Sequence, residues 1–391
     1  MLRYIKTMLP VLPNAKDPKL QTLLYQFTQA AAGLGKGLQA ELSVALGEWT
    51  TNLNSYYSNA MEGNPSKIKD IEAALNKHFS SDPSLRDYQK EHLAHIAVQK
   101  QLLLRLRNEP DLNICSQEFL CWLHYGFYSR LPKSMHFTST ISGKQVPIKA
   151  GELRSKPVQV GQHIPPQDRQ EVERYLKQFS ELLNPDSLAL PSKLLGLASS
   201  HHRLLWIHPF ADGNGRVARL FTLAYMVKCG LDVNLWTVTR AFARERKRYD
   251  TQLALADQPR LGHVDGRGPL SEKNLRAFCL YFFAAGLDQI QFMASHLQLG
   301  QFEQRYVRYL NVLIQEKTLS KSGFSVMQRL MRDGKILRGQ VRDIAHVQER
   351  RANQVIKELL SCGLVQSPSP RGALHLHITS DVAAVLFPKL V

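Results

Sequence analysis

The twelve-residue stretch HPFADGNGRVAR, residues 208–219, constrains the fold of this chain more than any other segment. Apolar residues recur after it at spacings of three and four, which predicts an amphipathic, core-packed helix that begins at about Asn214–Gly215. This apolar face consists of Val217, Leu220, Phe221, Ala224 and Val227, and Gly230 ends the run. The preceding LASSHHRLLWI is also predicted to be helical, so the stretch is a loop that runs into a helix N-terminus.

Such a helix N-terminus favours a bound anion, because it offers unpaired backbone N–H groups and a positive dipole. Gly213 and Gly215 allow the backbone to approach an anion closely. Arg216 and Arg219 fall on one helical face at a spacing of three, where they can grip more than one phosphate.

The other residues of the stretch suit a metal-bound nucleotide phosphate. Asp212 supplies the hard oxygen that Mg²⁺ prefers, and Mg²⁺ also binds phosphate oxygens. His208 titrates near neutrality and can remove a proton from a hydroxyl group. Since the stretch holds no Ser, Cys or Thr that could serve as nucleophile, the histidine is predicted to activate an external hydroxyl, and Phe210 is predicted to anchor the loop in the core.

Taken singly, these features are weak, because a His-Pro-Phe or Gly-Asn-Gly segment is usually a turn and paired arginines usually form a solvated face. The complete string, however, matches the motif HxFx(D/E)GNGRxxR of the Fic/Doc family at all eight fixed positions. The chain thus resembles this family over roughly residues 110–290. The resemblance implies nucleotidyl transfer, most often of AMP from ATP, to a Ser, Thr or Tyr hydroxyl of a target protein.

The resemblance also implies roles for individual residues. By position, His208 is the general base, Asp212 the Mg²⁺ ligand, Gly213, Asn214 and Gly215 the anion hole, Arg216 a phosphate ligand and Arg219 the ligand of the γ-phosphate. Tyr249 and Leu253, in RKRYDTQLALAD, are placed for the adenine pocket, although Tyr249 also suits a core position.

The segment GELRSKPVQVGQHIPP is similar to the flap of the family. Its extended residues could pair edge-on with the backbone of a target and place the target hydroxyl over His208. The flap residues are Val158, Gln159, Val160, Gly161, Gln162 and His163. The alternative is a loop that merely covers the core.

The segment SNAMEGN, residues 58–64, matches the inhibitory motif (S/T)xxxE(G/N) of the same family. Ser58 and Glu62 lie four residues apart on one face of a predicted helix that Gly63 ends. Glu62 is the only glutamate of the chain that precedes Gly or Asn. A carboxylate placed on Arg219 would occupy the position of the γ-phosphate, although Glu62-Gly63 could also be an ordinary exposed helix end.

Composition adds limits on compartment and partners. The net charge of +17, from 50 basic and 33 acidic residues, favours anionic partners such as nucleotides or nucleic acid. The five cysteines are scattered without CxxC spacing, which predicts free thiols in a reducing, cytoplasmic compartment. No segment was expected to reach the roughly 18–20 apolar residues of a membrane span.

The predicted fold class is mainly α: a Fic-type helical bundle with a short β-hairpin flap, followed by a winged helix-turn-helix domain. The predicted domains are an N-terminal helical region with the inhibitory helix (1–105), the catalytic core (106–298) and the winged helix (299–391). The last of these rests on a helix over 341–346, a longer helix over 350–361, Gly363 as a C-cap, a Ser/Pro/Gly-rich loop and a strand over 374–378.

Several functions remain open at this point. The leading hypothesis is an adenylyltransferase that Glu62 inhibits, with ATP as donor, Mg²⁺ bound, and a target protein or the chain itself as acceptor. The alternatives are another nucleotide donor, removal of AMP, or a DNA-binding transcription regulator whose core senses ATP. DNA binding through the basic residues Arg350, Arg351, Lys357 and Arg371, docking of a protein, and a homodimer are compatible with the C-terminal region.

Overall fold

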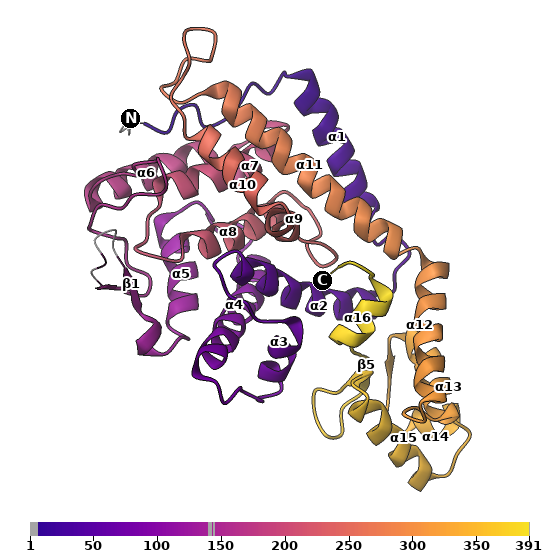
Figure 1. Ribbon diagram of the computed structural model, residues 1–391. Helices are drawn as coiled ribbons and strands as arrows, with labels where there is room; N and C mark the ends of the chain where they lie inside the picture. The colour runs from indigo at the N-terminus through magenta and orange to yellow at the C-terminus, as the bar shows by residue number, and fades with distance from the viewer. Residues whose placement is uncertain (1–6, 140–142, 144, 391) are drawn as a thin grey trace. The chain divides into compact units, whose positions relative to one another are not determined.

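The computed structural model describes residues 7–139, 143 and 145–390, and helices make up most of it (Figure 1). The chain divides into two compact units. The first comprises residues 1–32, 53–233 and 237–289, and the second comprises residues 33–52, 234–236 and 290–391. Residues 1–6, the start of the predicted N-terminal region 1–105, lie outside the described part of the chain.

The first unit is a helical bundle with one small hairpin. Its elements are α1 (Pro18–Gly33), residues 53–60 of α2 (Ala40–Ala60), α3 (Ile68–Leu75), α4 (Pro83–Asn108), α5 (Gln117–Tyr128), η1 (Lys133–Met135), β1 (Phe137–Ser139), β2 (Gln145–Pro147), α6 (Arg169–Leu183), η2 (Pro185–Ser187), α7 (Ser192–Ile207), α8 (Asn214–Lys228), α9 (Val238–Arg244), α10 (Arg246–Ala256) and most of α11 (Glu272–His296).

Helix α8 lies at the centre of this unit, in contact with α4, α5 and α7 (Figure 1). Nearly every residue from Asn214 to Met226 is buried, so α8 is enclosed on all sides rather than on one face. The apolar spacing predicted a helix from about Asn214–Gly215, and this start is confirmed at Asn214. Because α8 is enclosed, the loop before it emerges from a well-packed core.

Side-chain caps explain where the surrounding helices begin. Ser116 accepts a hydrogen bond from the Phe119 backbone N–H at 3.1 Å and so starts α5. Asp82 does the same for α4 through the Leu85 N–H at 2.8 Å. Both helices thus begin directly after a residue whose side chain caps them.

The region between α5 and α6 contains the predicted extended structure. Strands β1 and β2 pair antiparallel, with Thr138 opposite Val146. Further along, Val160 and His163 form an isolated antiparallel bridge around a two-residue turn, with backbone hydrogen bonds of 2.9 and 3.0 Å. The sequence predicted a short β-hairpin flap; the paired strands are β1 and β2, whereas the flap segment 158–163 is a tight turn without a regular strand.

The second unit combines helices with a three-stranded sheet. Its elements after residue 290 are the end of α11, α12 (Leu299–Gln315), α13 (Lys321–Asp333), β3 (Lys335–Ile336), α14 (Gln340–Ile344), α15 (Glu349–Ser361), β4 (Val365–Gln366), β5 (Leu374–Leu376) and α16 (Ser380–Leu386). The strand order is β3-β5-β4, and both pairs are antiparallel.

The predicted order of elements in this region is found, with shifted ends. Helix α14 begins one residue earlier and ends two residues earlier than predicted, because it is a single short turn, and β5 stops at Leu376. Gly363 has a φ of 64°, as expected for a residue that ends a helix. The winged-helix assignment and the three-part domain division remain predictions.

Helix α11 requires a correction to the expectation that no segment resembles a membrane span. By length and composition alone, it is long and apolar enough to cross a membrane. Half of its most apolar stretch is buried within the described chain, and core helices of many proteins have the same length and composition. One such helix is weak evidence for a membrane span.

Packing of α15 gives a test of the second unit. Leu359 is fully buried, whereas its neighbour Leu360 is 37% exposed. We expect Leu359→Ala to lower the local free energy of unfolding by about 2–5 kcal/mol, because it leaves a cavity. Leu360→Ala should change it by less than about 1 kcal/mol. Hydrogen exchange of the α15 amides measures both values, and equal effects would contradict this packing.

Candidate active site

The loop between α7 and α8 is held in a single shape by its own backbone and by one side chain. His208 ends α7 in a left-handed conformation, with φ 50°, and Gly213 precedes α8 with φ 77°. The Asn214 side chain accepts a hydrogen bond from the Phe210 N–H and donates one to the Phe210 carbonyl, both at 2.9 Å. Asn214, predicted as part of an anion hole, therefore braces the loop from within.

Phe210 anchors this loop in the core, as predicted. Its ring is fully buried and stacks on His124 of α5, with 4.1 Å between the ring centroids. His124 Nδ1 accepts a hydrogen bond from the Gly151 N–H at 2.8 Å, so its Nε2–H is the donor to the Asp212 carbonyl at 3.2 Å. His124 thus links the loop to the segment that follows the hairpin.

His208, the first residue of this loop, is half-buried. Burial, with smaller contributions from the Arg154 guanidinium and His163, lowers the pKa of His208 to about 4. The imidazole is therefore neutral near pH 7 and has a lone pair available to accept a proton.

Arg154 connects the segment after β2 to the loop between α7 and α8. Its guanidinium is buried and donates hydrogen bonds to the carbonyls of His208 at 2.6 Å, Lys156 at 3.0 Å and Pro166 at 2.6 Å. These bonds go to backbone oxygens rather than to a carboxylate. Arg154 consequently fixes the base of the flap beside His208.

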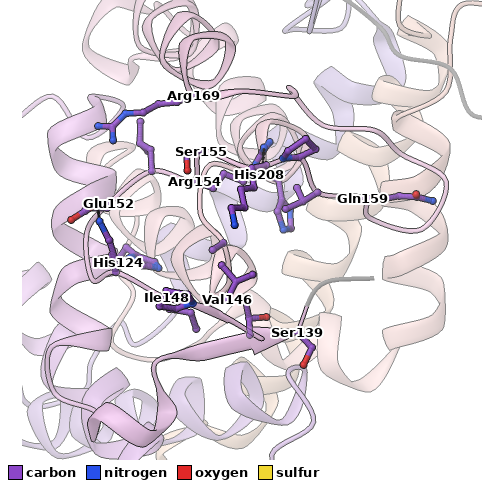
Figure 2. A pocket seen from close by; sticks show the side chains of 18 residues that line it. His124, Ser139, Val146, Ile148, Glu152, Arg154, Ser155, Gln159, Arg169 and His208 are labelled. Atoms are coloured by element: carbon purple, nitrogen blue, oxygen red, sulfur yellow. Dashed lines mark hydrogen bonds and ion pairs between the residues drawn. The ribbon is translucent and has the colours of Figure 1, made fainter. Parts of the chain in front are cut away.

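A pocket of about 700 Å³ opens next to His208. Figure 2 shows His208 and Arg154 across this pocket from Val146 and Ile148. Val158 and Gln159, two of the predicted flap residues, also line it. Its walls therefore come from the hairpin, the flap and the loop, and it can admit a side chain to the imidazole.

The predicted flap residues beyond Gln159 are not part of the pocket lining, and His163 ties this segment to α7. His163 Nε2–H donates to the Trp206 carbonyl at 2.8 Å. Gln159 bonds the Gly161 carbonyl at 2.8 Å, and Val160 is 42% exposed. Gly161 and Gln162 form the turn and are exposed.

Arg216, on the first turn of α8, is buried and held by two carboxylates. Its Nη1 lies 3.0 Å from Glu91 Oε1, and its Nη2 lies 3.3 Å from Asp212 Oδ2. Its guanidinium carbon also lies 4.5 Å from the centre of the Phe127 ring. Buried charge is costly unless paired, and these contacts supply the pairing.

Asp212 suits a metal that is carried by a nucleotide. Its side chain is 40% exposed, and its Oδ2 accepts hydrogen bonds from Tyr128 Oη and Arg216. Among the described residues, no cluster of three or more His, Cys, Asp or Glu side chains could hold a metal alone. Mg²⁺ commonly combines one or two carboxylates with phosphates and waters, so a single carboxylate fits.

Arg219 meets the segment predicted to be inhibitory. Its Nη2 lies 2.5 Å from Glu62 Oε1 and 2.9 Å from the Ser58 carbonyl, and its Nε lies 2.8 Å from Ser58 Oγ. Burial would raise the pKa of Glu62, but the guanidinium groups of Arg219 and Arg216 outweigh it and hold that pKa below its usual value. Glu62 is therefore ionised on Arg219.

The inhibitory segment departs from its prediction in one detail. Helix α2 ends at Ala60, so Glu62 lies in the following turn rather than within the helix, and Gly63 continues that turn with φ 88°. Gly215 lies so close that a Cβ on it would collide with the Glu62 carboxylate. The turn thus brings Glu62 directly onto the N-terminus of α8.

The two residues predicted for the adenine pocket differ in exposure. Tyr249 is buried, and its hydroxyl hydrogen-bonds to His201 Nε2 at 2.8 Å while its ring stacks on Phe242. Leu253 is half-buried, and its carbonyl accepts from His202 at 3.2 Å. Their role in binding a base stays a prediction.

Sequence reasoning did not select four residues that complete this site, namely Glu91, His124, Tyr128 and Arg154. His124 and Tyr128 stand four apart on α5, a spacing that could have marked a shared face. Glu91 carried no such signal, since it lies on a long helix among many polar residues.

Comparison with known proteins relates part of this chain to a known family. The Fic/DOC family model matches residues 114–226, which run from just before α5 through α8. This segment is a Fic/DOC domain. Relatives include protein adenylyltransferase Fic of Culex quinquefasciatus, 27% identical over 175 residues, and that of Nematostella vectensis, 36% identical over 90 residues. The first match covers 45% of this chain and 32% of the relative, and the second covers 23% and 21%. The chain thus spans about a third or less of these relatives.

Solved structures share the fold of this chain. A Fic family protein of Desulfovibrio desulfuricans G20 matches 93% of this chain and 98% of its own, with a TM-score of 0.54 and 14% identity. Fic-1 of C. elegans, residues 134–508, matches 72% of this chain and 73% of its own, with a TM-score of 0.55 and 21% identity. At these identities the likeness concerns the fold.

Buried histidines make the stability of the first unit pH-dependent. Burial lowers the pKa of His92 and of His124 from 6.5 to about 4. The unfolded chain therefore binds more protons between these values, and stability is lost as the pH falls from about 6.5 through about 4. We expect His92→Gln to remove about 1.4 kcal/mol per pH unit from the slope of the unfolding free energy in that window.

Denaturant titrations at several pH values between 4 and 7 measure this slope. The exposed His263 provides the matched control, and His263→Gln should leave the slope unchanged. Equal slopes for wild type and His92→Gln would contradict the prediction.

Proposed function

We propose that this chain is a protein adenylyltransferase that transfers AMP from ATP to a Ser, Thr or Tyr hydroxyl, and that Glu62 inhibits it. One observation carries the proposal. The loop of the Fic/DOC domain brings a neutral His208 imidazole, the N-terminus of α8 and the partly exposed Asp212 carboxylate together beside an open pocket. The donor, the metal and the acceptor are parts of the proposal.

The reaction needs a base and a site for phosphate charge. His208 takes the proton of the acceptor hydroxyl, whose oxygen then bonds to the α-phosphorus of ATP while the bond to the pyrophosphate breaks. The backbone N–H groups at Gly213–Gly215 and the guanidinium of Arg216 lie where phosphate oxygens would be stabilised. Bound Mg²⁺, held by Asp212 and the phosphates, would neutralise part of their charge.

The acceptor is proposed to enter on the flap side. The pocket beside His208 has room for a side chain, and the exposed turn at Val160–Gln162 offers backbone groups to an extended segment. This arrangement suits a protein target whose hydroxyl side chain reaches the imidazole. The chain itself is a further acceptor in the proposal.

Inhibition follows from electrostatics at Arg219. The ionised Glu62 is paired with the Arg219 guanidinium that is proposed to bind the γ-phosphate. A γ-phosphate beside this carboxylate would bring two negative charges close together, which costs several kcal/mol. ATP can then enter only with its triphosphate displaced from Arg219. Removal of AMP by water, which Glu62 could orient, is a second reaction within the same proposal.

We expect Glu62→Gly to raise incorporation of AMP from α-labelled ATP by at least about tenfold, because it frees Arg219 for the γ-phosphate. His208→Ala in the same background should lower it by about 10²–10⁴-fold, as loss of a general base does. Glu118→Gly, at an exposed glutamate of α5, is the control and should leave incorporation unchanged.

The position of the label separates the alternatives. Protein-bound label from the α position but not from the γ position supports AMP transfer, whereas γ label would indicate phosphorylation. Preferential incorporation from another labelled nucleotide would show that this nucleotide, and not ATP, is the donor. No label from any nucleotide, despite nucleotide binding, would favour a regulator that senses ATP.

The second unit supports DNA binding as an additional function. Its α14, α15 and three-stranded sheet occur in the order of a winged helix-turn-helix, and we propose that fold for residues 299–391. Arg350, Arg351 and Lys357 are exposed on α15, and Arg371 is exposed in the loop between β4 and β5. These cations could contact phosphates of a duplex, while a homodimer or protein contact is the alternative use of the surface.

If α15 binds DNA, affinity for a duplex should fall steeply with salt, because phosphate contacts release counterions. Arg350→Ala combined with Arg351→Ala should reduce the slope of log affinity against log salt by about 2. Fluorescence anisotropy with a labelled duplex measures this slope, and Arg260→Ala, an exposed arginine of the first unit, is the control. A flat salt dependence would exclude the DNA role.

A further inference from the structure

We propose that Tyr128 is a positioning residue for the metal-bound nucleotide: its hydroxyl holds one carboxylate oxygen of Asp212 and leaves the other for the cation. The inference rests on the proposed function, in which Asp212 binds Mg²⁺ together with ATP. It adds a residue of α5 that lies 84 positions before Asp212 in the chain.

The carboxylate of Asp212 is engaged on one side only. Tyr128 Oη donates to Oδ2, and Arg216 Nη2 donates to the same oxygen at 3.3 Å. No hydrogen bond joins Oδ1 to any described residue, and the side chain is 40% exposed. One oxygen is thus saturated by two donors while the other faces the solvent beside the phosphate site.

Tyr128 has little freedom to do anything else. Its ring is buried, and its backbone carbonyl accepts from His136 Nε2 at 2.8 Å. A phenol has a pKa of about 10 and is therefore a proton donor near pH 7. A buried hydroxyl without a partner would be costly, so the bond to Asp212 is strongly favoured.

The same ring also supports the glycine that precedes α8. A Cβ on Gly213 would lie 2.8 Å from Tyr128 Cε2 and 3.1 Å from its hydroxyl oxygen, and Gly213 has a φ of 77°. Contact between the ring and this glycine keeps the Asp212 side chain and the N-terminus of α8 in one fixed arrangement. The ring therefore contacts Gly213, while the hydroxyl holds Asp212. Tyr128→Phe separates these two contributions, because it keeps the ring and removes only the hydroxyl.

Outer-sphere hydrogen bonds of this kind orient metal ligands, and their loss typically lowers metal affinity about 10–100-fold. Without the phenol, the carboxylate gains basicity but also freedom to rotate, and Arg216 can then pair with both of its oxygens in a fork. The fork would compete with the cation for Oδ1. We therefore expect a net loss of metal affinity.

The test compares Glu62→Gly with Glu62→Gly/Tyr128→Phe. Mn²⁺ binding is followed by electron paramagnetic resonance in the presence of α,β-methylene-ATP, which cannot transfer AMP. Tyr128→Phe should weaken Mn²⁺ binding by about tenfold. Nucleotide affinity in a metal chelator should stay within about twofold, since Arg216, whose Nη2 donates to this hydroxyl at 3.5 Å, keeps its bonds to Glu91 and Asp212 without it.

Activity gives a second readout. The metal concentration for half-maximal AMP transfer should rise by a similar factor, while the rate at saturating Mg²⁺ should largely recover. Tyr225→Phe is the matched control, because its buried hydroxyl bonds the Leu183 carbonyl at 3.0 Å, away from the loop. It should change neither metal nor nucleotide binding.

Unchanged metal affinity in Tyr128→Phe would overturn the proposal. Equal loss of nucleotide binding with and without metal would also overturn it, because that pattern indicates a collapsed loop. The binding measurements need no AMP transfer, so a chain that binds nucleotide but modifies nothing would refute the proposed function and leave this inference standing. Absence of nucleotide binding in Glu62→Gly would refute both.

Discussion

The pairing of two buried arginines governs the arrangement of the first unit. Arg216 and Arg219 project from the first turns of a helix that is enclosed on all sides, and their side chains are 8% and 3% exposed. A buried guanidinium without a partner costs several kcal/mol, so carboxylates must reach both of them. Glu91 of α4 reaches Arg216, and Glu62 beyond α2 reaches Arg219. These requirements hold α2, α4 and α8 together.

The same pairing explains how a stable resting state and an anion site coexist. The N-terminus of α8 and two guanidinium groups create a strong positive potential at Gly213–Gly215. In the resting arrangement, protein carboxylates satisfy that potential in place of phosphates. Under the proposed function, binding of a triphosphate would exchange one set of anions for another, and the affinity would be the difference between the two.

Much of this site could be predicted from sequence because its main residues are contiguous. The loop, the start of α8 at Asn214, the buried Phe210 and the cap at Ser116 follow from local spacing and side-chain chemistry. The prediction of where α2 ends was less accurate, because the helix stops two residues before Glu62. The turn that follows the helix places the Glu62 carboxylate instead. Local rules place helix ends poorly when a tertiary ion pair determines the turn.

The sequence by itself determined which groups line the loop, because His208, Asp212 and the two arginines are neighbours whose geometry follows from one turn and one helix. Only the tertiary structure decided what surrounds them. Glu91, Tyr128 and Arg154 come from three separate segments, and no spacing along the chain relates them to the loop. Their positions depend on how the helices pack and on the need to pair buried charge, which are properties of the folded chain as a whole.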